Sequence, residues 1–419
     1  MNNPNLNDSV QNIPLDELDV SDPNIFKNDC WHPYFARLRE ESPVHYLADS
    51  VNGAFWSVAN HELIKEVDTN HQVFSSEAKG IAIVDPYVAE EGQMQGKNFI
   101  AMDEPEHMQQ RKAVAPTVQP RNLAELEPVI RERAIDILEN LPIGETFNWV
   151  QEVSIELTAR MLATLFDFPY EDRRKLVHWS DLATNVPEVT GDDSIDMKER
   201  YDELLGAASA FYQLWVSKQG QPPTFDLISM LQHNETTARM NEDPELFLGN
   251  LLLLIVGGND TTRNSISGGV IALNEYPEEY QKLRDNPGLI PNMVAEIVRW
   301  QTPVIHMRRT ALSDYELGGK QIKAGDKVVM WYLSGNRDET VFENAEKLII
   351  DRPNARGHVA FGFGVHRCMG NRLAEMQLRV LWEEITQRFT KVEIVGDIVR
   401  LPNNFIRGIA DVPVQLVPK

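Results

Sequence analysis

The chain has 419 residues, of which 42% are hydrophobic, enough for a buried core. Its formal net charge of −23 argues against a nucleic-acid-binding protein, because phosphate binding needs a basic face. The two cysteines, Cys30 and Cys368, are too few for a disulfide framework or a four-cysteine iron–sulfur cluster, and they indicate a reducing compartment.

The first twenty residues are polar and contain neither the basic segment nor the apolar segment of a secretory signal. The longest unbroken apolar runs, residues 251–256 and 328–333, are far shorter than the ~20 residues that span a bilayer. We therefore expect a loosely attached lead over residues 1–20, one domain over residues 21–419, no membrane span and a cytoplasmic location.

Two segments before residue 103 have distinct patterns. Residues 45–58 are typical of two short strands around Asn52-Gly53, a dipeptide that favours a hairpin turn. Residues 76–102 form a glycine-punctuated stretch that is too long for an ordinary connection, which predicts a lid or a binding loop. From the hairpin to about Thr310 the remaining hydrophobic patterns are mainly helical.

The strongest helix prediction runs from Pro244 to Tyr276. Asp243 can cap this helix, Pro244 suits its first turn and Pro277 ends it. A rise of about 1.5 Å per residue gives it a length of roughly 50 Å, enough to cross a whole domain. Its first half is apolar on nearly every side, which predicts a buried helix.

The pair Gly257-Gly258 inside this helix costs about 1 kcal/mol per glycine relative to alanine. The pair can mark a local opening of the helix, where a small molecule lies against the backbone and Asp260 and Thr261 transfer a proton. It can equally mark close helix packing at the glycines, with the Thr261 hydroxyl bonded to a backbone carbonyl. These residues alone do not decide between the two.

Glu296 and Arg299 lie three residues apart on a predicted helix and therefore share one face. An exposed ion pair of this kind contributes little to stability. The pair is expected to be partly enclosed, because four neighbouring residues are apolar: Met293, Val294, Ile297 and Trp300.

Strand patterns return after Thr310, at residues 315–319 and 327–331, and predict a small sheet. A final helix begins just past Cys368 and has one apolar face, formed by Ala374, Leu378, Leu381 and Ile385. We expect a mainly α, α+β protein with one central spanning helix.

The segment 361–370 is dense in glycine and places Cys368 at the start of that final helix. Free backbone N–H groups and the helix dipole are expected to lower the pKa of the thiol there. Gly364 and Gly370 would let the backbone approach a flat ligand, where a Cβ atom would collide. From these residues alone, an inert cysteine and a nucleophilic cysteine assisted by His366 both stay open as alternatives.

The cysteine segment resembles the haem loop of the cytochrome P450 family, Phe-x-x-Gly-x-x-x-Cys-x-Gly. Phe361, Gly364, Cys368 and Gly370 match this pattern at every fixed position. The resemblance implies a haem b cofactor with Cys368 as the axial thiolate ligand of its iron, which favours O–O cleavage.

Two further motifs resemble the same family and stand in the expected order. Residues 257–261 match Ala/Gly-Gly-x-Asp/Glu-Thr, and residues 296–299 match Glu-x-x-Arg. The likeness covers nearly the whole chain and implies the P450 fold, which is helix-rich with a long central helix and small sheets. It also implies that Asp260 and Thr261 help to protonate iron-bound dioxygen, and that Glu296 and Arg299 form a buried structural network. Four residues would hold the haem propionates: His107, Arg111, Arg309 and His366.

The chain has no dinucleotide-binding fingerprint and no flavin module. Electrons from NAD(P)H are therefore expected to arrive through separate proteins, a ferredoxin and its reductase. Five basic residues on the expected cysteine side either steer an acidic ferredoxin or are haem contacts and solvated charges: Arg111, Lys112, Arg367, Arg372 and Arg379.

Seven residues are expected to face the iron, although each also suits a plain core position: Leu253, Val256, Gly257, Ile305, Met307, Phe405 and Ile406. Such walls favour a hydrophobic, weakly functionalised substrate. Segments 102–107, 253–264 and 361–371 further resemble the bacterial alkane-hydroxylating subfamily. This resemblance implies terminal (omega) hydroxylation of medium-chain alkanes, fatty acids or related aliphatic chains.

Four alternative functions differ in what they require. Another hydrophobic substrate, such as a terpenoid, would keep the same chemistry. A peroxide-driven oxygenase usually lacks the acid–alcohol pair that Asp260 and Thr261 form here, and a non-catalytic haem-binding protein needs no such pair. A haem-free thiol enzyme would use Cys368 and His366.

Overall fold

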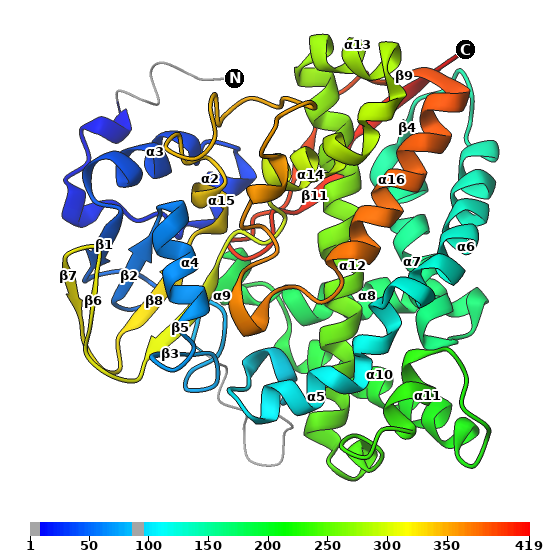
Figure 1. Ribbon diagram of the computed structural model, residues 1–419, viewed down its shortest axis with the longest axis horizontal. Helices are drawn as coiled ribbons and strands as arrows, with labels where there is room; N and C mark the ends of the chain where they lie inside the picture. Colours follow the sequence, from blue (N-terminus) through cyan, green and yellow to red (C-terminus); the bar gives the residue numbers. More distant parts are fainter. Residues whose placement is uncertain (1–8, 86–95) are drawn as a thin grey trace.

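The computed structural model of the chain describes residues 9–85 and 96–419. Figure 1 shows a part rich in strands beside a larger helical part, through which the long helix α12 (Pro244–Glu275) runs. The predicted caps of this helix are confirmed, because the Asp243 side chain accepts a hydrogen bond from the Leu246 N–H at 3.2 Å and Pro277 begins the next helix. The mainly helical fold is as predicted.

The other longer helices pack around α12 or against its neighbours: α5 (Glu106–Val114), α6 (Pro120–Glu139), α7 (Ile155–Phe166), α8 (Arg173–Thr184), α10 (Met197–Lys218), α11 (Leu227–Gln232), α13 (Pro277–Asp285), α14 (Ile290–Gln301) and α16 (Asn371–Arg388). Further helices are α2 (Pro23–Lys27), α3 (His32–Glu41), α4 (His61–Thr69), α9 (Pro187–Thr190) and α15 (Tyr332–Gly335). Short turns of helix are η1 (Leu15–Glu17), η2 (Phe99–Ala101), η3 (Ala115–Val118), η4 (Val150–Ser154), η5 (Tyr170–Asp172), η6 (Met240–Glu242), η7 (Pro287–Leu289), η8 (Ala355–Gly357) and η9 (Gly364–His366).

The main sheet has the strand order β1-β2-β8-β5-β3. Its strands are β1 (Val44–Leu47), β2 (Phe55–Val58), β8 (Lys327–Met330), β5 (Met307–Ala311) and β3 (Phe74–Ser75). The predicted hairpin is confirmed, because β1 and β2 pair in antiparallel fashion with Val44 opposite Val58.

Both predicted strands after Thr310 form, but they do not lie together in one small sheet. Strand β6 (Tyr315–Leu317) pairs instead with β7 (Lys320–Ile322), and β8 joins the main sheet. Gly318 and Gly319 form the turn with φ of 53° and 76°, values that glycine adopts without strain. The remaining strands form two small sheets, mostly from the last part of the chain: β10 (Val399–Arg400) with β11 (Ile409–Asp411), and β4 (Phe147–Asn148) with β12 (Pro413–Pro418) and β9 (Phe389–Ile394).

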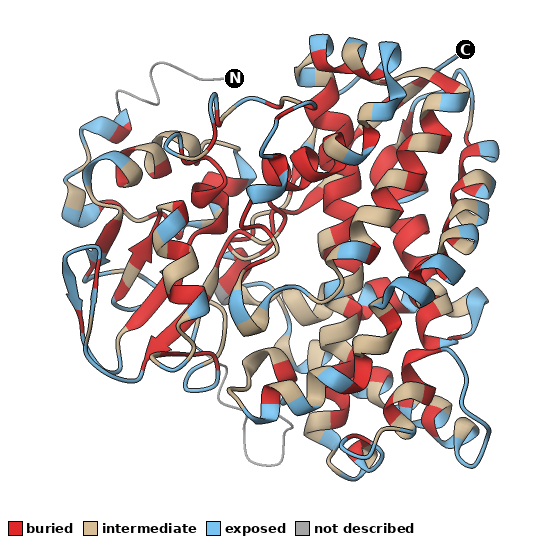
Figure 2. Cartoon of the chain, in the orientation of Figure 1, coloured by how far each residue is buried: buried red, intermediate tan, exposed pale blue. Residues whose placement is uncertain are grey.

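Helix α12 is buried along its second half and only partly along its first (Figure 2). Residues 262–273 are buried, whereas residues 252–254, Val256 and Gly257 are partly or well exposed. The predicted burial is confirmed for the second half of the helix and for residues 247–251, whereas part of the first half borders a cavity.

Residues 9–20 pack against the rest of the protein, contrary to the expected loose attachment. Val10, Leu18 and Val20 are buried, and Arg37 donates to the backbone carbonyls of Val10 and Ile13 at 2.8 and 2.6 Å. Residues 1–8 of this lead, and residues 86–95 of the predicted binding loop, lie outside the described residues.

Segments 378 positions apart in the chain meet at Asp29. Its carboxylate accepts a hydrogen bond from Arg407 at 2.9 Å and one from Arg400 at 3.0 Å. Asn404 also donates to the backbone carbonyl of Ser21 at 3.0 Å. The N-terminal helices thus hold the loop that carries Phe405 and Ile406.

Glu296 and Arg299 on α14 are completely buried. Their side chains form two hydrogen bonds of 2.8 Å, and Arg352, which the sequence analysis did not single out, donates to the same carboxylate at 2.9 Å. Arg299 also donates to backbone carbonyls of the segment 336–347. This network ties α14 to the segment that precedes the cysteine loop.

Within residues 9–85 and 96–419, no helix combines the length and the apolar character that a membrane crossing requires.

Candidate active site around Cys368

A cavity of about 1420 Å³ lies between α12, β5 and the cysteine loop. Cys368 borders it together with six of the seven residues predicted to face the iron: Leu253, Val256, Gly257, Met307, Phe405 and Ile406. Apolar residues that were not predicted to face the iron add further walls, among them Met102, Val118, Leu162, Leu248, Leu252 and Val298.

The prediction for Ile305 is wrong. Its side chain is completely buried, packs in a core cluster with Trp331 and Leu333, and does not line the cavity. Its neighbour Val304 does line the cavity, so the alternation of an extended chain directs Ile305 to the opposite side.

The Cys368 side chain is accessible from the cavity although protein surrounds it. Its backbone N–H donates to the Phe361 carbonyl at 2.7 Å, which closes the loop. Burial raises the pKa of the thiol, while the N–H groups of Gly370 and Asn371 and the charge of Arg111 lower it by less. The expected net lowering of this pKa is therefore wrong for the protein alone, because desolvation outweighs the helix terminus.

Gly364 and Gly370 of the cysteine loop have different surroundings, so the reason for a glycine differs between them. At Gly364, which has a φ of +65°, a Cβ atom would lie 2.5 Å from the backbone oxygen of Asp68. The close approach that requires this glycine is therefore to helix α4, which corrects the expectation of a flat ligand there. Gly370 borders the cavity, and a Cβ atom at Gly370 would meet no atom within 4 Å.

Asp68, at the end of α4, is a site residue that the sequence did not reveal. It is 2% exposed, and its carboxylate accepts hydrogen bonds from Arg309 at 2.9 Å, the Tyr332 hydroxyl at 2.8 Å and the Phe363 N–H at 2.7 Å. No motif marks a lone aspartate of this kind, and its role follows from the fold alone.

The four predicted propionate contacts all border the cavity: His107, Arg111, Arg309 and His366. The imidazole rings of His107 and His366 lie 4.0 Å apart. His107 contacts the backbone oxygens of Phe99 and Val365 at 2.8 and 3.1 Å, and Arg111 donates to the Arg367 carbonyl at 2.5 Å. These donors come from three separate elements, α5, β5 and the cysteine loop.

His366 carries an unsatisfied polar atom. Its Nε2 contacts the Ser76 hydroxyl at 3.1 Å, whereas its buried Nδ1 has no hydrogen-bond partner among the described residues. Burial, together with the nearby charge of Arg309, lowers the pKa of this imidazole to about 2. A buried polar atom of this kind indicates a missing partner.

The donor set fits a haem. A single thiol suits an iron ligand, the cationic Arg111 and Arg309 suit carboxylates, and the unpartnered His366 Nδ1 suits a hydrogen bond to one of them. Gly257 and Gly370 both border the cavity with open space beside their backbones, so a flat group can lie there without meeting a side chain.

The two glycines of the α12 pair have separate surroundings, and the close helix packing weighed from the sequence applies to Gly258. At Gly258 a Cβ atom would lie 2.9 Å from Leu162 of α7, which is close helix packing. Gly257 borders the cavity and accepts a hydrogen bond from the Thr261 hydroxyl at 3.0 Å through its carbonyl oxygen. The helix is continuous through both residues, so the local opening, which was one of the two alternatives, is absent within α12.

Thr261 lines the cavity, but Asp260 does not. The Asp260 carboxylate is 1% exposed and lies on the side of α8, where it pairs with Arg263 at 2.7 Å and accepts from Ser180 at 3.1 Å. Burial raises its pKa, and Arg263 lowers it by less. Arg263 also pairs with Asp181, which is 39% exposed, so a chain of polar groups leads from behind Thr261 to the surface.

Three of the five basic residues considered for docking a ferredoxin are exposed. Arg379 forms ion pairs with Glu127 at 2.7 Å and Glu383 at 2.8 Å, and Arg111 faces the cavity. Lys112, Arg367 and Arg372 are exposed.

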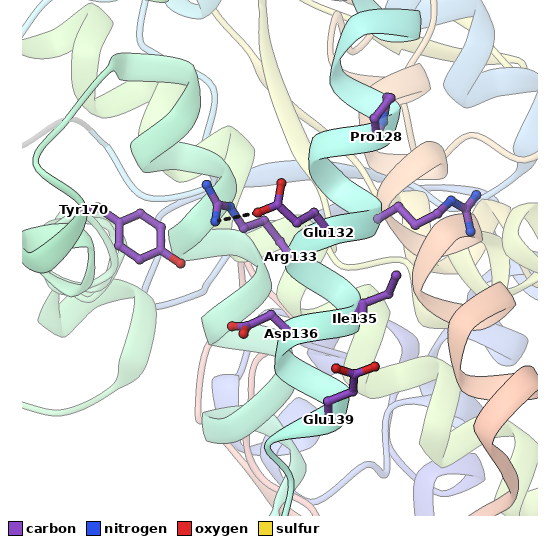
Figure 3. A pocket seen from close by; sticks show the side chains of 8 residues that line it. Pro128, Glu132, Arg133, Ile135, Asp136, Glu139 and Tyr170 are labelled. Atoms are coloured by element: carbon purple, nitrogen blue, oxygen red, sulfur yellow. Dashed lines mark ion pairs between the residues drawn. The ribbon is translucent and has the colours of Figure 1, made fainter.

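A second pocket, of about 680 Å³, lies on the surface of α6 beside Tyr170 (Figure 3). Arg133 lies over the Tyr170 ring at 5.0 Å and forms an ion pair with Glu132 at 3.7 Å. None of the residues predicted for the site lines this pocket.

Comparisons with known proteins agree on one family. The model of the family described as cytochrome P450 matches residues 288–407. The chain is 37% identical over 417 residues to linalool 8-monooxygenase of Pseudomonas putida, which covers 97% of this chain and 100% of the relative. It is 34% identical over 416 residues to a steroid C26-monooxygenase of Rhodococcus jostii, with 96% and 85% covered.

Two solved structures are similar over almost their whole length. Cytochrome P450-153 from Novosphingobium aromaticivorans has a TM-score of 0.88 at 46% identity and covers 95% of this chain and 99% of its own. CYP153D17 from Sphingomonas sp. PAMC 26605 has a TM-score of 0.91 at 45% identity, with 96% and 100% covered.

Proposed function

The chain belongs to the cytochrome P450 family, and from this premise we propose that it hydroxylates the terminal carbon of medium-chain alkanes, fatty acids or related aliphatic chains. Its fold is the P450 fold, and it is a haem-dependent monooxygenase that uses dioxygen and electrons from NAD(P)H delivered by redox partners. The proposal concerns the substrate and the position of attack.

The observation that carries the proposal is a row of apolar side chains along α12. Leu248, Leu252 and Val256 line the cavity at spacings of four residues and lead to Gly257 and Thr261. At a rise of about 1.5 Å per residue, the row from Leu248 to Val256 is about 12 Å long. An extended hydrocarbon chain can lie along this row with one end toward Thr261, and such walls favour a substrate with few polar groups.

The side chains that would hold the haem are Cys368 at its iron and Arg309, Arg111, His107 and His366 at its propionates. When bound, the haem supplies the activation of dioxygen that inserts one oxygen atom into a C–H bond. Asp68 would keep Arg309 oriented through their 2.9 Å ion pair, so that the guanidinium faces the cavity without rearrangement.

Thr261 and Asp260 would hold and transfer protons in this reaction. The Thr261 Oγ1, now bonded to the Gly257 carbonyl, can turn to hold a proton within the cavity. The buried Asp260 carboxylate would exchange protons with solvent along the groups that link it through Arg263 to Asp181.

A terpenoid substrate is the second candidate. The relative linalool 8-monooxygenase, at 37% identity over 97% of this chain, acts on linalool by its name. A branched terpenoid needs a wider cavity than a linear chain, so the two candidates differ in the shape that the walls must accept.

An acidic ferredoxin is the proposed electron donor. Lys112, Arg367 and Arg372 are exposed, and Arg367 and Arg372 flank Cys368 in the sequence on a protein with a net charge of −23. A local positive region of this kind speeds encounter with an acidic partner.

Titration and product analysis test the proposed function together. Spin-state shifts of the haem protein are measured with a linear alkane, a fatty acid and linalool of similar carbon number. Turnover with a ferredoxin system then identifies the products, with hydrogen peroxide as a separate oxidant. Mainly terminal alcohols from the linear substrates support the proposal, and mainly subterminal alcohols contradict it. Tighter binding and faster turnover of linalool would favour the second candidate.

A further inference from the structure

The side chains of consecutive residues around the start of β5 point alternately to opposite sides of the chain. Met307 and Arg309 line the cavity, whereas His306 and Arg308 lie on the other side of the chain and contact the segment 81–85. This division follows from the alternation of side chains along an extended strand. One strand therefore both forms a wall of the cavity and fastens a second wall.

His306 is completely buried and joins two loops that border the cavity. Its Nε2 accepts a hydrogen bond from the Ile83 N–H at 2.9 Å, and its Nδ1 donates to the Asn404 carbonyl at 2.9 Å. Burial lowers the pKa of this imidazole to about 3, so it is neutral near pH 7 and one nitrogen can accept while the other donates.

Arg308 and Lys327 hold the same segment through hydrogen bonds and ion pairs. The Arg308 backbone N–H donates to the Ile81 carbonyl at 2.7 Å, and its guanidinium donates to Asp85 at 2.7 Å. Lys327 donates to the Ile83 carbonyl at 2.9 Å and pairs with Asp85 at 3.2 Å. Arg308 and Lys327 are 1% and 8% exposed, so loss of the buried hydrogen bond from Lys327 to the Ile83 carbonyl is costly. The Asp85 carboxylate, in contrast, is 63% exposed, so its ion pairs contribute less.

The fastened segment is itself part of the substrate site. Ile81, Ala82, Val84 and Asp85 line the cavity, while Ile83 is buried in a core cluster behind it. Among the described residues, no hydrogen bond joins the segment 81–85 to Thr261. None joins His306, Arg308 or Lys327 to Cys368 either. The position of the segment can therefore change without a direct change at the reacting end of the cavity.

We propose that His306, Arg308 and Lys327, named here the 81–85 clasp, are positioning residues that determine which carbon of the substrate faces the reacting end of the cavity. The clasp fixes the wall formed by Ile81–Asp85, and this wall limits how the substrate chain can shift or bend. The proposal rests on the proposed function, because it concerns the choice between terminal and neighbouring carbons.

Substitution of Lys327 tests the clasp. Lys327→Met keeps the methylene stem but removes the hydrogen bonds to the Ile83 and Asn52 carbonyls and the ion pair with Asp85, and Lys327→Arg restores donors at the same place. Asp85→Asn weakens only the ion pairs with Arg308 and Lys327, from an exposed position, and guards against a variant that does not fold. Lys320→Met, on the exposed strand β7, is the matched control.

The measurements are the ratio of terminal to neighbouring alcohols, the dissociation constant from spin-shift titration, and the carbon monoxide difference spectrum of the reduced protein. A displacement of ~1 Å in a positioned group can change a rate by about 100-fold, so we expect the ratio to change by about tenfold in Lys327→Met and by less in Asp85→Asn. Binding should weaken, the spectrum should stay that of the parent, and Lys327→Arg should recover most of the parent ratio.

A purely structural role would lower thermal stability and leave the product ratio and the dissociation constant unchanged, and this outcome overturns the proposal. Equal changes in Lys320→Met would also overturn it. Each variant is compared with the parent on the same substrate. If the parent itself produced mainly subterminal alcohols, the proposed function would fail, while a changed product distribution in Lys327→Met would still support the clasp.

Discussion

Asp68 and Phe363 are joined by a hydrogen bond of 2.7 Å between the Phe363 N–H and the buried Asp68 carboxylate. The same carboxylate holds Arg309 at 2.9 Å and the Tyr332 hydroxyl at 2.8 Å. The orientation of the cysteine loop and that of a cationic group in the cavity therefore depend on one side chain from helix α4.

Asp68→Asn is expected to destabilise the protein strongly, because it leaves the Arg309 charge buried without its partner. Breaking a buried ion pair typically costs about 3 to 5 kcal/mol. Guanidinium unfolding of the parent and the variant measures this loss, with Asp397→Asn, at an exposed site, as the control. A loss no greater than that of the control would show that Asp68 does not stabilise Arg309.

Thr261→Ala should lower product formation by about 100-fold, the lower end of the range for general acid–base catalysis. Its hydroxyl borders the cavity, and Asp260 behind it does not. Thr261→Ser keeps the hydroxyl and should retain most of the activity. The product formed per NAD(P)H consumed distinguishes a lost proton donor from weak substrate binding, which would leave this ratio unchanged.

Arg372→Glu should slow the first reduction of the haem protein by an acidic ferredoxin, mainly at low ionic strength. Arg372 is exposed, and charge steering between exposed groups weakens as the Debye length falls to about 10 Å near 0.1 M salt. Stopped-flow reduction at several salt concentrations measures the effect. Rates that match the parent at every salt concentration would exclude Arg372 from the docking surface.

His306 should make the protein sensitive to acid. Burial lowers the pKa of His306 from 6.5 to about 3 in the folded protein, so between these values the unfolded chain binds one more proton. The stability that this neutral imidazole supports is present above pH 6.5 and is lost as the pH falls toward 3. The contribution to the slope is at most about 1.4 kcal/mol per pH unit.

His306→Gln is the matched variant for this prediction, because glutamine can accept and donate at similar positions but does not titrate. Unfolding free energies of both proteins are compared between pH 7 and 4.5. The variant should lose stability less steeply as the pH falls, and parallel curves would show that His306 does not contribute to acid sensitivity.

Local patterns were sufficient to predict the elements with strong local signals. The hairpin of residues 45–58 follows from a turn dipeptide between two short strands, and helix α12 follows from its capping residues and apolar run. The cysteine loop, the glycine pair and the Glu296–Arg299 pair could be found because each is a short motif with fixed spacing. Predicted residues from separate parts of the chain, such as His107 and His366, meet at one cavity.

The failures concern directions and partners that depend on tertiary packing. Neighbouring residues on a helix point in different directions, but which of Asp260 and Thr261 faces the cavity depends on how α12 packs. Ile305 is apolar like its neighbours Val304 and Met307, but its side chain points into the core and not into the cavity. Asp68 and Arg352 are single charged residues far in sequence from their partners, so no local pattern could identify them.

The contacts of Asp29 with Arg400 and Arg407 have a consequence for how the protein is made. During synthesis, Asp29 leaves the ribosome long before the arginines that neutralise it, and the loop carrying Phe405 cannot take its place until then. A large separation between contacting residues slows folding, since a long loop must close first. The wall that carries Phe405 therefore closes only after the C-terminal part of the chain has been made, so its formation is a late step.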